Sequence, residues 1–318
     1  MTSPRFETSQ WAHWLQTPLP GDASARRYFY LTKPNAPRVI LMRDPPAPHK
    51  NGSVVFENIA NALRAQGLAA PAIYFHDPET GTMVIEDLGA TDFASFLTDH
   101  PTQEGRLYAA AAQVSKLVST IDCPLGTADM NHVNAAEMVN IAATHYAQND
   151  ALCDDLRGLI QLAFDANVSH DRRLALRDFH AENLIWRPEK SDHQRVGLLD
   201  FQDACYAPIG YDLMSLLRDI RRGVSATTAA DLMADFQSEN HLSDAHLACV
   251  GAQRNLRILG VFARLSTNGK PQYLRYLPAV WQQLQIDLAH PALLQLNTFV
   301  TTQFPAPDAA YLKGLAVT

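Results

Sequence analysis

The chain has 318 residues, of which 47% are apolar and 19% are charged, a composition typical of a folded globular protein rather than a disordered one. Its 26 Lys and Arg against 33 Asp and Glu give a net charge of −7, so partners such as nucleic acid or an anionic membrane are not expected. The length is enough for two domains or lobes.

The glycines are too widely spaced for either common glycine-rich nucleotide motif. The closest pair, Gly81 and Gly89, is eight residues apart, whereas a dinucleotide fingerprint or a Walker A loop needs much closer glycines. A bound nucleotide must therefore be held in another way. The sequence also predicts neither a signal peptide nor a membrane span, which favours a cytoplasmic protein.

Residues 1–88 are predicted to form a small β-rich lobe with one helix. Short β-rich runs bounded by turn residues predict strands at 28–31, 38–43, 72–76 and 82–86. Apolar residues recur at helical spacing over 54–66, with Ser53 as the predicted N-cap and Gly67 as the stop. The segment GDASARR (21–27) comes before the first of these strands and is predicted to turn between two strands.

Residues 89–318 are predicted to form a larger, mainly helical lobe. Helical patterns cover 92–98, 103–120, 135–148 and 150–166. Three β-like runs interrupt this pattern between residues 172 and 200, and after Ile209 the chain is helical to near its end. The predicted fold class is therefore α+β with two lobes.

The segment 174–213 carries the residues that indicate chemistry. Asp178 is followed five residues later by Asn183, and Asp200 ends an apolar run 22 residues after Asp178. Kinase-like enzymes use this pattern for phosphoryl transfer. A carboxylate on a rigid loop can accept the proton of an attacking hydroxyl, and an amide oxygen with a second carboxylate suits Mg²⁺.

These motifs resemble those of the aminoglycoside phosphotransferase and choline kinase superfamily, which has a bilobal protein kinase-like fold. The chain is most similar to the bacterial kinases that phosphorylate the anomeric hydroxyl of N-acetylmuramate and N-acetylglucosamine in cell-wall recycling. The segments that carry this likeness are GDASARRYF (21–29), EDLG (86–89), RDFHAEN (177–183), LLDFQDACYAPIGYDL (198–213) and GVFARL (260–265).

The resemblance implies a nucleotide-binding lobe at 1–88 and a catalytic and substrate-binding lobe at 89–318. It implies ATP and Mg²⁺ as cofactors, Asp178 as the catalytic base, and Asn183 and Asp200 as the metal ligands. The remaining residues that it implies for ATP binding are Ser24 and Arg26 in the loop over the phosphates, Met42 on a strand, and Glu86, Asp87 and Leu88 at the hinge.

One position departs from the kinase pattern. The strand RVILMR (38–43) has Met42 about where the phosphate-binding Lys is expected, and Arg43 follows it. A thioether cannot pair with phosphate oxygens, and Glu57 on the next helix would lack its usual Lys partner. The sequence therefore leaves open which residue clamps the phosphates.

Further residues are candidates for contacting the substrate or supporting the catalytic loop. These are His180, Asp203, Asp212, Arg257 and Arg264. Residues 243–318 carry six Lys and Arg against three Asp, a net charge of +3. This charge favours a neutral or anionic acceptor, such as the carboxylate of N-acetylmuramate, over a polycationic aminoglycoside.

The predicted function is ATP- and Mg²⁺-dependent transfer of the γ-phosphate to a small-molecule acceptor, an amino sugar, with no obligate protein partner. Two alternatives stay open at this point. One is a related phosphotransferase with another acceptor, such as an amino alcohol. The other is a nucleotide-binding module without catalysis, which the missing strand Lys would allow.

Overall fold

The computed structural model describes residues 5–19, 26–45, 52–124 and 126–315. The chain divides into two compact units. Unit 1 comprises Met1–Thr127 with Glu182–Ala204, and unit 2 comprises Ala128–Ala181 with Cys205–Thr318. The predicted division into a nucleotide-binding lobe at 1–88 and a catalytic and substrate-binding lobe at 89–318 stays a prediction.

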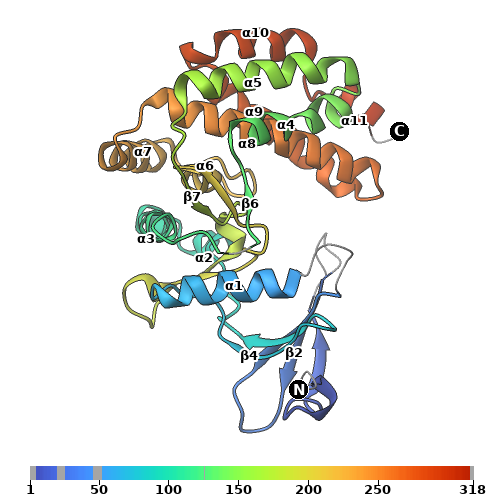
Figure 1. The fold of residues 1–318 in the computed structure, drawn as a ribbon, viewed down its shortest axis with the longest axis vertical. Coiled ribbons are helices and arrows are strands. Elements are labelled where there is room, and N and C mark those ends of the chain that lie inside the picture. The colour runs from blue at the N-terminus through green and yellow to red at the C-terminus, as the bar shows by residue number, and fades with distance from the viewer. Residues whose placement is uncertain (1–4, 20–25, 46–51, 125, 316–318) are drawn as a thin grey trace. The chain divides into compact units, whose positions relative to one another are not determined.

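Unit 1 is built on an antiparallel five-stranded sheet with the order β1-β2-β3-β5-β4 (Figure 1). Its strands are β1 (Leu15–Pro18), β2 (Arg27–Thr32), β3 (Val39–Arg43), β4 (Ile73–Asp77) and β5 (Thr82–Glu86). The pairs β1–β2, β2–β3 and β4–β5 are neighbours in sequence. Strand β3 pairs with β5, and α1 and β4 lie between them in the chain. The four predicted strands and the helix between the second and the third are confirmed, and β1 precedes them.

The two faces of this sheet follow from the alternation of side chains along each strand. Leu31, Val39, Leu41 and Val84 are buried on one face, where they form a small core with Phe6. The opposite face carries Tyr28, Tyr30 and Ile40 and is the face on which the pocket described below is built.

Helix α1 (Gly52–Ala65) buries an apolar stripe made by Phe56, Ile59, Ala60 and Leu63. The sequence pattern predicted this stripe. The helix begins two residues earlier than expected, so the prediction of Ser53 as the N-cap is wrong and Ser53 lies within the first turn. The remaining helices of unit 1 are α2 (Phe93–Asp99) and α3 (Glu104–Val118). Asp92 caps α2 by accepting a hydrogen bond from the backbone N–H of Ser95.

A short hairpin from the middle of the chain completes unit 1. It consists of β8 (Leu184–Trp186) and β9 (Val196–Leu198). Backbone hydrogen bonds from Leu198 N–H to Ala69 O (2.9 Å) and from Trp186 N–H to Thr91 O (2.9 Å) hold it against the segments that follow α1 and β5. Residues far apart in sequence thus share one unit.

Unit 2 combines a three-stranded sheet with a helical bundle. The sheet has the order β6-β10-β7, formed by β6 (Ala128–Asp129), β10 (Cys205–Pro208) and β7 (Arg172–Ala175). The helices are α4 (His132–Glu137), α5 (Cys153–Asn167), α6 (Tyr211–Leu217), α7 (Ala226–Asn240), α8 (Asp244–Thr267), α9 (Leu277–Leu288), α10 (Leu294–Gln303) and α11 (Ala309–Leu315). The predicted α+β class with a mainly helical C-terminal part is confirmed.

The predicted helix at 135–148 is interrupted. It comprises α4 and a separate π-helical turn, Ala142–Tyr146. This turn packs against α8, where a Cβ at Gly260 would lie 2.4 Å from the carbonyl carbon of Ile141. Such close backbone packing favours local irregularity over one continuous helix.

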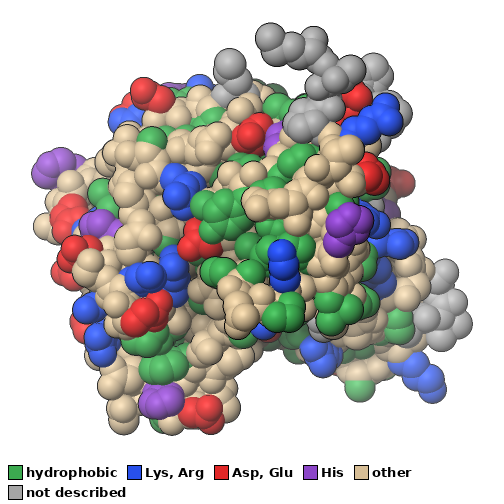
Figure 2. Space-filling model, turned by 90° about the horizontal axis from the view of Figure 1, so that it is seen from below, with side chains coloured by type: hydrophobic (Ala, Val, Ile, Leu, Met, Phe, Trp, Pro, Cys, Tyr) green, Lys and Arg blue, Asp and Glu red, His purple; other side chains and the backbone are tan. Residues whose placement is uncertain are grey.

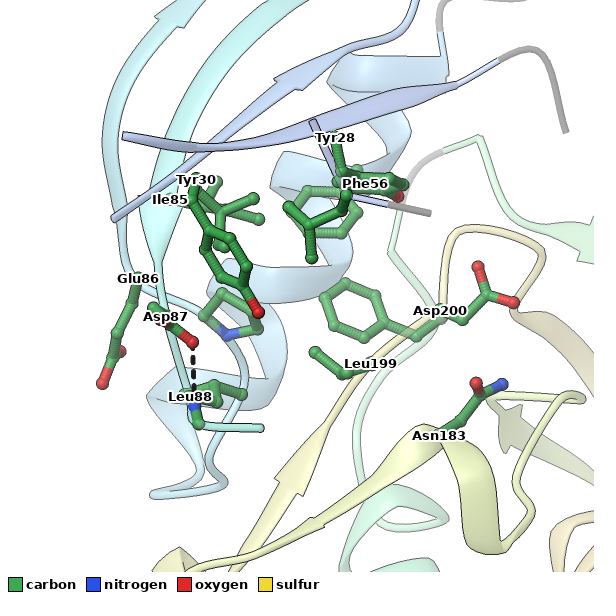
Figure 3. Close-up of a pocket in the computed structure, with 15 residues that line it drawn as sticks. Tyr28, Tyr30, Phe56, Ile85, Glu86, Asp87, Leu88, Asn183, Leu199 and Asp200 are labelled. Carbon is green, nitrogen blue, oxygen red and sulfur yellow. Dashed lines mark hydrogen bonds between the residues drawn. The ribbon is translucent and has the colours of Figure 1, made fainter. Parts of the chain in front are cut away.

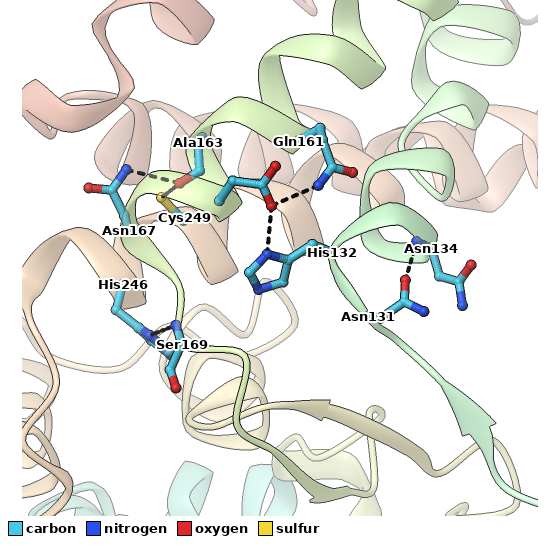
Figure 4. Close-up of polar contacts among 10 residues, drawn as sticks. Asn131, His132, Asn134, Gln161, Ala163, Asn167, Ser169, His246 and Cys249 are labelled. Atoms are coloured by element: carbon cyan, nitrogen blue, oxygen red, sulfur yellow. Dashed lines mark hydrogen bonds and ion pairs between the residues drawn. The ribbon is translucent and has the colours of Figure 1, made fainter.

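Polar contacts tie α4, α5 and α8 together (Figure 4). His132 Nδ1 lies 2.9 Å from Asp165 Oδ1, and Gln161 donates to the same oxygen at 2.8 Å. The backbone N–H of Ser169 donates to His246 Nδ1 at 3.3 Å. The contacts of Asp165 lower the pKa of its carboxyl, with the Gln161 hydrogen bond as the largest cause and His132 next.

The surface has the mixed charge expected from the composition. On the face seen in Figure 2, Lys and Arg side chains are interspersed with Asp and Glu, and neither sign forms a continuous field over the described residues. Among those residues, no helix combines the length and the apolar character that a membrane crossing needs.

Candidate active site

A cavity of about 250 Å³ lies in unit 1 against the pocket face of the sheet. Its walls are mostly apolar and aromatic, and they come from β2, β3, β5, α1 and the segment after β9. The wall residues are Leu19, Tyr28, Tyr30, Ile40, Phe56, Pro71, Ile85, Leu88, Leu199 and Phe201. Phe56 and Phe201 stack with ring centroids 4.7 Å apart and an interplanar angle of 19°.

The two ends of the pocket differ in character (Figure 3). Glu86, Asp87 and Leu88 line one end, where β5 runs into a loop. Asn183 and Asp200 line the opposite end, with their polar groups on the same side. The structure therefore brings together five residues that the sequence placed in one site.

The β8–β9 hairpin explains why Asn183 and Asp200 meet. Leu184 pairs with Leu198 in the ladder, and the backbone N–H of Leu199 donates to Asn183 O at 3.0 Å. The next residue, Asp200, has a φ of +55°, a conformation that costs a non-glycine residue about 1–2 kcal/mol. Gln202 Nε2 donates to Asp200 Oδ1 at 2.6 Å and helps to fix that carboxylate.

The end at Glu86–Leu88 is held by contacts of the acidic side chains. Glu86 Oε2 accepts from the backbone N–H of Ala72 at 3.1 Å. Asp87 Oδ1 accepts from the backbone N–H of Gly89 at 3.0 Å, and Asp87 Oδ2 pairs with Arg38. The backbone N–H of Glu86 is engaged as well, with Ala72 O at 2.8 Å, so a ligand here would meet the apolar walls and the backbone that follows this N–H.

This arrangement fits a purine nucleotide and a hard cation. Flat apolar walls such as Tyr30 and Phe56 suit an adenine ring, and backbone N–H and C=O groups at 86–88 can pair with its edge. The amide oxygen of Asn183 and the carboxylate of Asp200 form an oxygen donor set of the type that Mg²⁺ prefers when phosphates complete its coordination.

The other residues predicted for ATP binding lie in different places. Ser24 is outside the described residues. Met42 is fully buried and pairs with Tyr28 in the sheet. The Arg26 side chain is 7% exposed and pairs with Asp44 at 2.8 Å. Glu57, predicted to lack a Lys partner, instead contacts His76 Nδ1 at 2.8 Å.

In unit 2, two buried carboxylates hold the loop that carries Asp178. Asp212 accepts hydrogen bonds from the backbone N–H of Leu176 (2.7 Å) and of Arg177 (2.9 Å). Asp219 Oδ2 accepts from the backbone N–H of Ala181 at 3.2 Å. Burial raises the pKa of both carboxyls, that of Asp212 to about 6. Asp178 is thus flanked by anchored backbone on both sides.

His180 and Arg254 are buried near this loop. Burial lowers the pKa of His180 well below its ordinary value, and Arg221 and Arg254 act in the same direction, so the imidazole is neutral near pH 7. Burial also lowers the pKa of Arg254, and Asp178 is among the groups that oppose this. Arg254 Nη2 donates to Ser215 Oγ at 2.9 Å, and Ser215 Oγ donates to Arg177 O at 2.8 Å.

The predicted acceptor residues differ in exposure. Arg257 is half-buried on α8, Arg264 is exposed on the same helix, and Asp203 is half-buried in unit 1 outside the residues that line the pocket. Burial lowers the pKa of His145, and Arg264 adds to this effect. The roles predicted for these three residues stay predictions.

Sequence reasoning missed the supporting roles of Asp219 and Arg254. Asp219 lies beyond the end of α6 (Tyr211–Leu217), so helical periodicity could not connect it with Asp212. Arg254 carried no signal, since residue type cannot tell this buried arginine from the half-buried Arg257 on the same helix.

The chain is similar to known phosphotransferases over most of its length. The model of a family described as "Phosphotransferase enzyme family" matches residues 16–247. The chain is 36% identical over 278 residues to an N-acetylmuramate/N-acetylglucosamine kinase of Caulobacter vibrioides, covering 79% of this chain and 74% of that protein. It is 25% identical over 308 residues to a kinase of the same name from Pseudomonas aeruginosa, covering 90% and 87% of the two chains.

Solved structures with the same fold are more distant in sequence. A choline/ethanolamine kinase family protein from Mesorhizobium loti aligns with a TM-score of 0.61 at 13% identity, over 96% of this chain and 94% of that one. A ternary complex of the aminoglycoside phosphotransferase APH(4)-Ia with ADP and hygromycin B aligns with a TM-score of 0.58 at 12% identity, over 86% and 94%. Identities this low establish the kinase-like fold alone.

Proposed function

Because the chain belongs to the phosphotransferase enzyme family, we propose that it is an ATP- and Mg²⁺-dependent kinase of the anomeric hydroxyl of N-acetylmuramate or N-acetylglucosamine. One observation carries this proposal most directly. A single pocket has apolar walls, a backbone edge at Glu86–Leu88, and the oxygen pair Asn183 and Asp200 at its far end.

The pocket supports a defined orientation of the nucleotide. Tyr30, Ile40 and Phe56 would enclose the adenine ring, and the backbone of 86–88 would pair with its edge. The phosphates would then extend toward Asn183 and Asp200, which would hold Mg²⁺. When bound, ATP supplies the phosphoryl group and Mg²⁺ neutralises charge on it during transfer.

Asp178 would act as the general base. Its carboxylate would orient the acceptor hydroxyl and take its proton as the oxygen attacks phosphorus. Its loop is fixed by Asp212 and Asp219, so that little reorganisation is needed at the moment of transfer. His180, neutral and buried, would support the loop rather than exchange protons.

The acceptor would be a sugar of low or negative charge. The relatives that match with 36% and 25% identity are named for N-acetylmuramate and N-acetylglucosamine, and residues 243–318 have a net charge of +3. Arg257 and Arg264 are the candidate contacts for the lactyl carboxylate of N-acetylmuramate. A reaction that consumes ATP and such sugars would take place in the cytoplasm.

An acceptor panel tests the proposal. The purified chain, MgATP and one acceptor at a time are coupled to an ADP readout, with N-acetylmuramate, N-acetylglucosamine, choline, ethanolamine and hygromycin B as acceptors. The proposal requires turnover with at least one amino sugar well above that with the amino alcohols. Turnover with choline alone would support the alternative acceptor class, and ATP binding without turnover on any acceptor would support a non-catalytic module.

A further inference from the structure

The phosphate clamp of kinase-like enzymes has two parts, a Lys on the third strand and a Glu on the following helix. Neither part is in place here. The third strand carries the fully buried Met42, and Glu57 of α1 contacts His76 Nδ1 at 2.8 Å. The second ring nitrogen of His76 lies 2.9 Å from Ser53 Oγ. Another cation must therefore compensate the charge of the nucleotide phosphates.

Side-chain alternation excludes the arginine closest in sequence to Met42. Tyr28, Tyr30 and Ile40 line the pocket, so the odd-numbered positions of β2 and β3 face away from it. Arg43 is at one of these odd-numbered positions. Its guanidinium lies 5.4 Å from the ring centroid of Phe29, on the face opposite the pocket. It cannot reach the pocket without a change of register.

Two arginines of the described residues, Arg26 and Arg38, lie next to these strands at even-numbered positions, the positions that face the pocket. Arg38 precedes β3, lies 4.0 Å from the ring centroid of Tyr30, and pairs with Asp87 at the hinge end. Arg26 immediately precedes β2 at the opposite end. Its side chain hydrogen-bonds Tyr28, which lines the pocket. Of these two arginines, Arg26 therefore lies at the end of the pocket away from Glu86–Leu88.

The electrostatic environment of Tyr28 locates Arg26 further. Burial raises the pKa of Tyr28, the Arg26 guanidinium acts in the opposite direction, and the Asp200 carboxylate adds to the rise. Arg26 and the predicted metal ligand Asp200 thus both affect the pKa of Tyr28. A group that bridges Asp200 and Arg26 through a metal and phosphate oxygens would lie beside the Tyr28 hydroxyl.

Asp44 holds Arg26 in a fixed position. Asp44 Oδ2 accepts from Arg26 Nε at 2.9 Å and lies 2.8 Å from Nη2. Two glycines make room for this pair. A Cβ at Gly52 would lie 2.3 Å from Asp44 Oδ2, and a Cβ at Gly81 would lie 1.8 Å from Asp44 O. The backbone N–H of Asp44 also donates to Gly81 O at 2.9 Å.

We propose that Arg26, positioned by Asp44, contacts the phosphates of the bound nucleotide and takes the role that a strand Lys has in related folds. The inference rests on the proposed nucleotide site and names the cation of that site. A guanidinium has five donors in a planar fork, so it can hold the Asp44 carboxylate with one edge and phosphate oxygens with another. The Asp44–Arg26 pair then replaces the Glu–Lys pair.

Binding measurements on the full chain test this assignment without requiring any acceptor. MgATP and adenosine are titrated calorimetrically into the wild type, Arg26→Gln and Arg43→Gln. Arg26→Gln should lose about 10- to 100-fold in MgATP affinity, the range for a lost charge-assisted hydrogen bond, and keep its adenosine affinity. Arg43→Gln should bind both ligands as the wild type does.

Two further variants separate phosphate binding from folding. Asp44→Asn keeps the cation but weakens its anchor, so MgATP affinity should fall by less than in Arg26→Gln. The double variant Arg26→Gln/Asp44→Asn avoids leaving one buried charge unpaired. The assignment is overturned if a folded Arg26→Gln or double variant binds MgATP like the wild type, or if adenosine affinity falls in parallel. Failure of the proposed function would look different, since wild type would then turn over no amino sugar while these binding results could still hold.

Discussion

Asp212 Oδ1 accepts a 2.9 Å hydrogen bond from the backbone N–H of Arg177, whose φ of +70° lies in the left-handed region. Glycine adopts that conformation without strain, whereas for an arginine it costs about 1–2 kcal/mol. The carboxylate of Asp212, buried and bonded to two successive backbone amides, therefore stabilises a strained loop immediately before Asp178.

The proposed base should be essential for turnover and dispensable for nucleotide binding. Asp178→Asn keeps the size of the side chain and removes its ability to accept a proton. We expect kcat to fall by about 10²–10⁴-fold and MgATP affinity to stay within the error of calorimetry. Steady-state kinetics with the best acceptor of the panel measure the first quantity.

Asp171→Asn is the matched control for this variant. Asp171 is exposed and forms only a long ion pair with Arg173, at 3.7 Å, so its loss should leave kcat unchanged. Near-normal kcat in Asp178→Asn would remove Asp178 from the mechanism.

Ser215 should position the loop through Arg177. Its hydroxyl donates to Arg177 O and accepts from Arg254 Nη2, so Ser215→Ala removes both contacts and leaves buried polar groups without a partner. We expect a loss of about 1–3 kcal/mol in the free energy of unfolding, together with a lower kcat at nearly constant KM for MgATP.

Ser266→Ala provides the comparison for Ser215→Ala. Ser266 is also buried on a helix, but its hydroxyl donates to Phe262 O one turn earlier, at 2.8 Å, and not to the loop. If both alanine variants lower kcat equally after correction for folded fraction, Ser215 has only a structural role.

Gly81 should be intolerant of any side chain. Gly81→Ala would place a Cβ 1.8 Å from Asp44 O at a φ of +66°, so steric overlap adds to backbone strain. We expect a loss of about 2–5 kcal/mol in the free energy of unfolding by urea titration.

Gly67→Ala isolates the backbone contribution. Gly67 has a similar φ of +75°, and no heavy atom lies within 4 Å of the position that a Cβ would take there, so the change should cost only about 1 kcal/mol. Equal losses in the two variants would contradict the close approach at Asp44.

Asp287 should make stability depend on pH. Burial raises its pKa from 3.8 to about 6, opposed by Arg218 and Asn255. Between these values the native state holds a proton that the unfolded state has released, so this carboxyl contributes stability below pH 4 that is lost as the pH rises through 6.

The comparison with Asp287→Asn measures this contribution. The unfolding free energy of the wild type minus that of the variant should fall by about 2 kcal/mol from pH 4 to pH 7. A difference that is constant over this range, or that rises with pH, would contradict a raised pKa of Asp287 in the folded chain.

The sequence predicted those parts of the fold that depend on local pattern. The strands at 28–31, 38–43, 72–76 and 82–86 and the apolar stripe of α1 follow from periodicity alone, and the observed elements confirm them. The two-residue strand β6 and its partner β10 have no such pattern, because they are formed by pairing between distant segments. Short strands of this kind depend on tertiary context.

The site divides in the same way. Asn183 and Asp200 could be placed together because the two runs between them have clear β character and pair as a hairpin. The pairing of Arg26 with Asp44 could not, since it depends on the close approach allowed by Gly52 and Gly81. The likeness to known kinases predicted a Lys near position 42, and the structure shows Met42 there, with Arg26 and Asp44 paired nearby.

The position of the phosphate in the product tests the central claim most directly. The chain is incubated with MgATP and N-acetylmuramate or N-acetylglucosamine, and a ³¹P–¹H correlation spectrum identifies the carbon that bears the new phosphate. Anomeric phosphorylation predicts a correlation to the proton on C1 and a phosphate that mild acid releases. A phosphate on any other carbon, or transfer only to acceptors that are not sugars, would contradict the account.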